Sequence, residues 1–456
     1  MTIHQTTFRP AVTPAEQRFL DLYAAVSGKL PGTRSAAVRA WRDRAVDAFT
    51  MLGVPHRRVE EWKYTDLRTL MQEVHPLGGL SPKAADVSVE AAIGKSLAHL
   101  DAYRAVFVGG RFRAELSTIQ DAHGVTFEPL HQALEDDGGS AQAIAKFSLR
   151  HRDVVAALST AFATDGAILA VAPKARLEKP IHLIFISADD KPALYALQHA
   201  ISIGEEAEVS LIETHGPHQS QAISHTRLAI AAGASVKHVR LAAGEASKQL
   251  ASAAVTLAER ADYEPLQMAV NGAVVRAEAA IRFEGPNARC HYTGAMLLRG
   301  HSHADFTLVV DHVAPGCESR ELVKAVLDGR SRDVFQGKVI VERGAQKTDG
   351  KQMANALLLS DDAEFDSKPE LEIFADDVVC GHGSTAGQLD QDMLFYLRAR
   401  GIAEAEARSL LIAAFVGEAL DKIDNEMLRA ALDEQVAAWL AGTMLARPYR
   451  PKGIRR

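Results

Sequence analysis

The chain has 456 residues, of which 47% are apolar and 24% charged, and its formal net charge is −7. This composition is typical of a globular protein long enough for two or three domains. The net negative charge does not favour binding to nucleic acid, which is itself negatively charged, so we expect no nucleic-acid partner. The longest apolar run, residues 410–417, is too short to span a bilayer, and we expect no membrane association.

The three cysteines, Cys290, Cys317 and Cys380, are widely separated and odd in number. This pattern argues against a disulfide framework and fits a reducing compartment. The first residues lack a basic segment followed by an apolar one, so no secretory signal is indicated. The predicted location is the cytoplasm.

Residues 1–160 mix helical periodicity with short strands, and we predict a mostly helical domain there. Residues 36–49 have the pattern of an amphipathic helix. Residues 103–108 have the pattern of a strand that enters a tight turn at Gly109 and Gly110.

Residues 161–387 repeat a pattern every 27–32 residues, in which an apolar, strand-like segment leads to a small residue and then to another extended segment. The small residues are Ala175, Ala207, Ala234, Ala261, Ala288, Cys317 and Ala345. An apolar residue lies four positions earlier in most repeats: Val171, Ile203, Ile230, Leu257, Val313 and Val341, with Phe283 shifted by one. A fixed period of this length means stacked units, and short strands without helices between them favour a parallel β-solenoid over a β-sandwich.

Residues 388–456 return to helical patterns, with helices predicted at about 390–400, 404–422 and 425–440. Gly401 follows the first helix as its C′ residue, and Asn425 is a plausible N-cap for the third. Residues 410–416 are apolar around most of the helix circumference, which indicates burial either within this helical domain or under a partner.

Motifs of common enzymes are missing: the sequence has no phosphate loop, no GxGxxG, no HExxH and no GxSxG. The segment 368–383 is the most informative one. Its Cys380 and His382 share parity on a predicted strand, so that a thiol and an imidazole project from one face, and both groups suit iron or zinc. Two ligands are too few for a stable site, so any others must come from a partner or from nearby residues. The alternative is a buried cysteine beside an edge histidine.

A second histidine pair, His301 and His303, also has the spacing to share a strand face. No cysteine or carboxylate occupies a matching position, so the structural interpretation of this pair is preferred over a metal site.

Several segments together resemble the SufB/SufD family of iron–sulfur cluster assembly scaffolds. The segments lie at residues 60–65, 357–363, 368–373, 380–383 and 394–402. The resemblance implies a right-handed parallel β-helix flanked by helical N- and C-terminal domains. It also implies a non-enzymatic scaffold that pairs with SufB as a heterodimer and binds the ATPase SufC, which hydrolyses ATP, through its C-terminal helices.

By the same resemblance, His382 matches a family histidine at the SufB interface near the proposed site of the nascent cluster, and Cys380 matches its neighbouring cysteine. Both would be iron ligands of a transient iron–sulfur cluster shared with SufB. Gly381 stands where relatives commonly have serine. The resemblance further implies a reduced flavin, but no residue of this sequence indicates a flavin site.

Two other functions stay open. β-Helices often belong to carbohydrate-active enzymes, which would need converging carboxylates in an exposed groove. The chain could instead be a stabilising partner without cluster chemistry, and a homodimer in isolation is compatible with either scaffold hypothesis.

Overall fold

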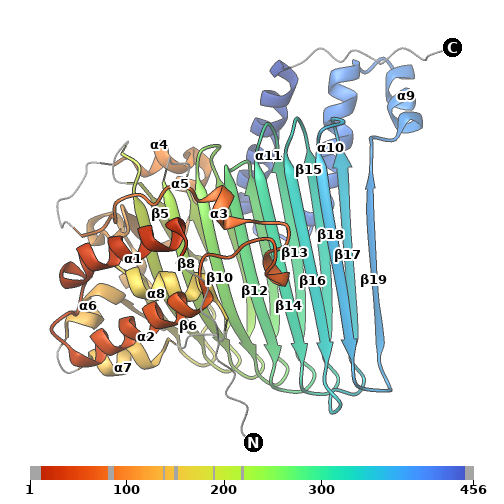
Figure 1. Ribbon diagram of the computed structural model, residues 1–456. Helices are drawn as coiled ribbons and strands as arrows, with labels where there is room; N and C mark the ends of the chain where they lie inside the picture. The colour runs from red at the N-terminus through yellow and green to blue at the C-terminus, as the bar shows by residue number, and fades with distance from the viewer. Residues whose placement is uncertain are drawn as a thin grey trace, which may run out of the picture.

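The computed structural model describes residues 12–80, 87–136, 139–147, 152–187, 191–216 and 220–446. Two long sheets face each other and are wound by one chain that alternates between them, forming a parallel β-solenoid of about seven turns with helices at both ends of the sequence (Figure 1). The predicted mainly β, solenoid fold is therefore confirmed. Its handedness, expected from the family resemblance, stays a prediction.

Even-numbered and odd-numbered strands form separate sheets, and all strand pairs are parallel except β1–β2 and β3–β4. The even-numbered sheet consists, in order, of β18 (Glu364–Ile373), β16 (Arg332–Val341), β14 (His303–His312), β12 (Val274–Phe283), β10 (Lys248–Leu257), β8 (Gln221–Ile230), β6 (Leu194–Ile203), β4 (Ala167–Val171) and β3 (Val125–Pro129). The odd-numbered sheet consists of β19 (Val379–Gly387), β17 (Asp349–Leu358), β15 (Glu318–Leu327), β13 (Arg289–Leu298), β11 (Asp262–Val270), β9 (Ser235–Ala243), β7 (Glu208–His215), β5 (Ile181–Ile186), β1 (Tyr103–Val108) and β2 (Arg111–Phe112).

The chain passes from the even-numbered to the odd-numbered sheet at a tight corner that ends on a small, buried residue. Ala207, for example, is fully buried directly before β7. The residue before each of these corner residues has a positive φ, and the seven positions are Lys174, Glu206, Gly233, Arg260, Asn287, Gly316 and Lys347. The left-handed backbone reverses the chain, and the small side chain lets the next coil stack closely.

The predicted corner residues are confirmed except at the last position. Cys317 and Thr348 occupy equivalent places, because Glu318 pairs with Asp349 in the strand register. Ala345 lies three residues earlier in a longer turn, although it is also buried. The prediction of Ala345 was wrong because this turn contains three extra residues, which a fixed period cannot anticipate.

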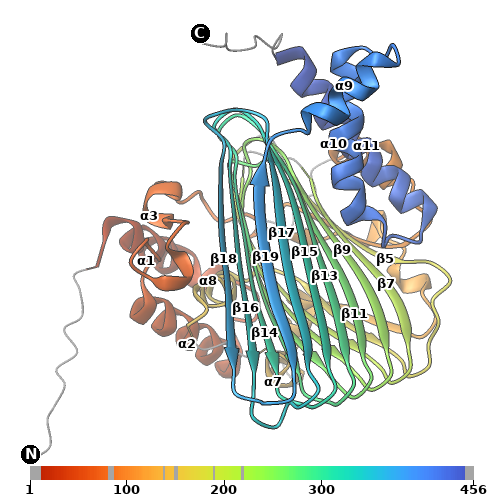
Figure 2. The same cartoon turned by 90° about the vertical axis from the view of Figure 1, so that its right-hand side faces the viewer.

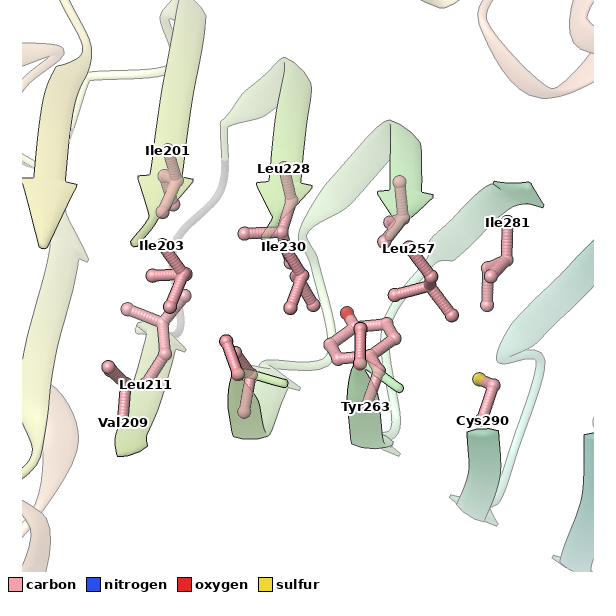
Figure 3. Packing of buried hydrophobic residues seen from close by; sticks show 14 of the residues in the cluster. Ile201, Ile203, Val209, Leu211, Leu228, Ile230, Leu257, Tyr263, Ile281 and Cys290 are labelled. Carbon is pink, nitrogen blue, oxygen red and sulfur yellow. The ribbon is translucent and has the colours of Figure 1, made fainter. Parts of the chain in front are cut away.

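The interior between the sheets is filled by stacked apolar side chains. In Figure 3, Ile201 and Ile203 of β6 lie near Val209 and Leu211 of β7, and the same rows continue into the next coils. Val313 was predicted to continue one row, but His312 takes that place: it pairs with Phe283 and Val341 in the register and stacks on the Phe283 ring with centroids 4.4 Å apart. The corner after β14 is one residue longer than the corners after β6, β8 and β10, which shifts the inward position.

N-terminal helices cover the outer face of the even-numbered sheet. Val154, Leu158 and other residues of α8 pack against Leu194 and Ile223 of the strands. Ser35 caps the N-terminus of α2 through its hydroxyl, which accepts from the Val38 N–H. The helices of this part are α1 (Pro14–Val26), α2 (Ala36–Leu52), α3 (Leu67–Leu70), α6 (Leu130–Glu135), α7 (Ser140–Ala145) and α8 (Val154–Phe162). Two short helices of the N-terminal region, α4 (Val89–Ile93) and α5 (Lys95–Ala98), pack instead on the odd-numbered sheet beside β1 and β5.

C-terminal helices cover the outer face of the odd-numbered sheet, on the opposite side of the molecule (Figure 2). These are α9 (Gln391–Ala399), α10 (Glu404–Leu420) and α11 (Glu426–Ala446), which confirm the three predicted helices. Gly401 has a φ of +87° after α9, and Asn425 accepts a hydrogen bond from the Leu428 N–H, so both predicted cap residues are confirmed. No helix in the described ranges is long and apolar enough to cross a membrane.

A strap formed by residues 60–78 crosses the outer face of the even-numbered sheet from strand to strand. Near the beginning of the strap, Trp62 covers the buried Arg276 guanidinium at 3.8 Å, and Arg276 forms an ion pair with the equally buried Asp305. The strap also contacts all the remaining even-numbered strands from β6 to β18. The contacts are made with Leu194, Gln221, Lys248, His303, Gln336 and Lys368. The N-terminal region is thereby fastened to the terminal strand β18.

The predicted domain boundaries at 160/161 and 387/388 stay predictions. The strand predicted at residues 103–108 is confirmed as β1, and it joins the odd-numbered sheet beside β5. The N-terminal region therefore contributes strands to the solenoid as well as helices.

Candidate functional site

Both sheets end on a strand that has one neighbour among the described residues. β18 pairs with β16, and β19 pairs with β17, and each is the last strand of its sheet. Figure 2 looks towards this end of the solenoid, where β18 and β19 stand in front. The backbone N–H and C=O groups along the outer edges of the two strands are therefore free to pair with another chain. We call this region, formed by β18, β19 and the turn between them, the open end.

Cys380 and His382 both lie on β19, two residues apart, so their side chains project from the same side of the sheet. Cys380 is half-buried and packs against the interior apolar cluster, so this side faces the solenoid interior. His382 is exposed, because no further coil covers it. The shared parity predicted for the thiol and the imidazole is confirmed, and the pair is not sealed inside the core.

Small residues surround the pair. A methyl group on Gly350, the register partner of Cys380, would lie 3.7 Å from Sγ, and one on Gly381 would meet no atom within 4 Å. Burial raises the pKa of the Cys380 thiol, although a backbone hydrogen bond from Gly350 opposes this rise. The thiol therefore holds its proton at neutral pH and would release it on binding a metal.

Within the described residues, no group of three or more His, Cys, Asp and Glu side chains is arranged to hold a metal ion. Cys380 and His382 thus form at most part of a ligand set. A site at this end needs further ligands, which the sequence analysis expects from a partner or from nearby residues.

The other histidine pair does not form a site. His301 lies in the turn before β14, so the predicted common strand face was wrong. His303 is buried, its Nε2 lies 2.9 Å from the Thr65 hydroxyl of the strap, and burial lowers its pKa to about 4. The structural interpretation of His303 is confirmed.

The C-terminal helices carry exposed apolar side chains. Met393, Phe395 and Tyr396 of α9 and Leu410 of α10 are each about half exposed or more, whereas Ile412 and Val416 of α10 are buried against the odd-numbered sheet. The apolar segment 410–416 is therefore buried on one side only, and α10 is in contact with α9.

Sequence reasoning missed the residues directly behind the pair. Gly350 and Gln352 of β17 are the register partners of Cys380 and His382. They lie 30 residues earlier, close to the repeat length, so an alignment of the repeats by strand position would have revealed them.

The solenoid and its open end define the class of this protein: a β-solenoid that presents a thiol and an imidazole beside strand edges with which no described residue pairs. Residues 185–415 match the family model described as "SUF system FeS cluster assembly, SufBD core domain", and residues 13–183 match the SufBD protein N-terminal region. The chain belongs to the SufBD family of iron–sulfur cluster assembly proteins.

Individual relatives agree with this assignment. The iron–sulfur cluster assembly protein SufD of Escherichia coli is 31% identical over 402 residues, which are 86% of this chain and 90% of the relative. An iron–sulfur cluster assembly SufBD family protein of Synechocystis is 28% identical over 89% of this chain and 92% of its own length. SufD of Bacillus subtilis is 25% identical over 60% of this chain and 64% of its own length.

Proposed function

We propose that this chain is a non-enzymatic scaffold subunit of a SufBCD-like complex, and that its open end pairs with SufB. The observation that carries the proposal is the coincidence of two unpaired strand edges with an incomplete thiol–imidazole pair in one place. A second solenoid that continued both sheets would satisfy the edge hydrogen bonds and bring its own ligands next to Cys380 and His382.

Under this proposal the two residues supply part of the ligand set of a transient iron–sulfur cluster, which is the cargo of the complex and is shared with SufB. Thiolate and imidazole are suitable iron ligands, and the flanking glycines leave room for the approach of a partner's backbone. A reduced flavin stays an expectation from the family resemblance, and we propose no site for it.

The exposed apolar surface of α9 and α10 is the proposed docking site for the ATPase SufC. Met393, Phe395, Tyr396 and Leu410 form a surface that an apolar partner face would bury. ATP hydrolysis would then come from SufC, and α10, packed directly on the odd-numbered sheet, would transmit its movement towards the solenoid.

The cytoplasm remains the proposed location, in keeping with three free cysteines. Membership of the SufBD family favours the scaffold over the alternative of a carbohydrate-active β-helix enzyme.

Pairing at the open end is tested with charged substitutions of its exposed apolar residues. Phe374 and Val379 are 55% and 60% exposed. The double variant Phe374→Asp/Val379→Asp should abolish the complex with SufB in size-exclusion chromatography with light scattering. The matched control, Met51→Asp, changes a residue of α2 that is 84% exposed and should leave the complex intact.

Participation of the ligand pair is tested by anaerobic reconstitution of the three-subunit complex. His382→Ala should strongly reduce the absorption of the assembled cluster, whereas His301→Ala, which removes another exposed histidine, should not. Equal cluster formation in both variants would support the hypothesis of a stabilising partner without cluster chemistry. A homodimer of the isolated chain would appear in the same chromatography when SufB is left out.

A further inference from the structure

Behind His382, two buried polar side chains continue the same interior row. Glu321 of β15 pairs with Gln352 of β17, and Gln352 pairs with His382 of β19. Because paired residues of parallel strands point to the same side, the three side chains follow one another at the strand spacing of about 4.8 Å. The row thus leads from the solenoid interior to the exposed imidazole.

Glu321 and Gln352 are 3% and 2% exposed. Neither carboxyl oxygen of Glu321 and neither polar atom of the Gln352 amide has a hydrogen-bond partner of good geometry among the described residues. Buried polar groups are normally hydrogen-bonded, so these atoms need partners. The neighbours along the row carry polar groups that can provide them.

The direction of the amide follows from its two neighbours. Burial raises the pKa of Glu321 to about 8, and the Gln352 side chain opposes that rise, as an N–H donor to the ionised carboxylate does. With Nε2 directed to the ionised Glu321, at a pH above 8, Oε1 remains as an acceptor. A methyl group on Gly337 would lie 2.9 Å from Oε1, so this glycine of the opposite sheet provides the space for the amide oxygen.

We propose that Gln352 is a positioning residue for His382: its Oε1 accepts the N–H of the inward ring nitrogen and leaves the other ring nitrogen unprotonated and directed outwards. Glu321 orients the amide from behind. This inference deepens the proposed function and rests on it for the role of His382 as a ligand. Histidines that bind metals commonly donate their second ring N–H to such an acceptor, which fixes the tautomer and the ring orientation.

The first test measures the tautomer of His382 in the isolated chain. The histidines are labelled with ¹⁵N, and spectra are recorded well above the usual imidazole pKa of about 6.5, with the His382 signals identified by their loss in His382→Ala. In the parent one tautomer should dominate, and in Gln352→Met the two tautomers should be mixed. Identical His382 signals in parent and variant would overturn the proposal.

Gln249 of β10 provides the matched control. It is 1% exposed, and both polar atoms of its amide also lack a partner among the described residues, but it lies in a middle coil. Gln249→Met should leave the His382 signals unchanged. If Gln352→Met does not fold, Gly337→Ala is the second variant, because its methyl group would lie 2.8 Å from the Phe335 ring and 2.9 Å from Oε1, so that it crowds Oε1 without removing it and should also mix the tautomers.

The second test measures Co²⁺ affinity in the complex with SufB. Gln352→Met should weaken binding about tenfold, as the loss of a partner behind a metal-bound histidine does, and Gln249→Met should not weaken it. Equal affinities for parent and Gln352→Met would contradict the role. If no complex with SufB forms, the proposed function fails, whereas the tautomer measurement still decides the orientation of His382.

Discussion

The middle coils and the last coil of the solenoid are built from the same repeat, yet they differ in what surrounds them. In β10 and β12 each strand has neighbours on both sides, and inward residues such as Leu257 and Ile281 are almost fully buried. In β18 and β19 one edge is free, and the inward residues Leu371 and Cys380 are only half-buried. The unfinished stacking at one end, rather than a special local structure, creates the surface on which the proposed function depends.

The largest expected effect compares two ion pairs near the same strap. Asp305→Ala removes the fully buried carboxylate that pairs with Arg276 in the middle of the sheet and leaves the guanidinium only Glu278 and the Glu61 carbonyl, so it should lower the free energy of unfolding by about 3–5 kcal/mol. Lys368→Ala breaks the exposed pair with Glu60 at β18 and should change stability little. Urea unfolding of both variants measures the difference, and similar losses would mean that the strap holds both coils equally.

A second comparison uses one interior row. Ile281, Val310, Val339 and Leu371 follow one another in the register. Ile281→Ala should lower the free energy of unfolding by about 2–5 kcal/mol, because it leaves a cavity between two coils. Leu371→Ala should have less than half that effect in the isolated chain and a larger effect on the complex with SufB. An equal effect in the isolated chain would argue that the last coil is already well covered.

The third prediction concerns pH. The pKa of Glu321 is about 8 in the folded chain, above its usual value, so the folded state binds the proton more tightly and this group's contribution to stability is lost as pH rises towards 8. Glu321→Gln should therefore flatten the decrease in thermal midpoint between pH 6 and pH 8.5. Parallel curves for parent and variant would show that Glu321 ionises normally.

The smallest effect concerns the corners. Arg260 has a φ of +53°, a conformation that glycine adopts without strain. Arg260→Gly should raise the free energy of unfolding by up to about 1 kcal/mol, whereas Arg260→Ala, which loses the same side chain, should not. Equal stability of the glycine and alanine variants would contradict strain at this corner.

The sequence alone predicted the solenoid because each coil repeats the same physical requirement, a small residue where the chain reverses. It failed at Ala345 and Val313, where corners of different length shift the register by a few residues. A periodic pattern does not contain loop lengths, and only the paired strands reveal that Thr348 and His312 take these places.

For the candidate site, parity along one strand was enough to bring Cys380 and His382 to the same side. It was not enough to identify Gln352 and Glu321, because their proximity depends on the register between coils. The exposure of His382 was equally out of reach, since it results from the absence of a further coil next to β19 in the described chain.

Amide hydrogen exchange with and without SufB tests the central claim most directly. If SufB continues both sheets, peptides from β18 and β19 should exchange much more slowly in the complex, while peptides from β10 and β12 should not change. Unchanged exchange in β18 and β19, in a complex that does form, would show that SufB binds elsewhere and would contradict the account.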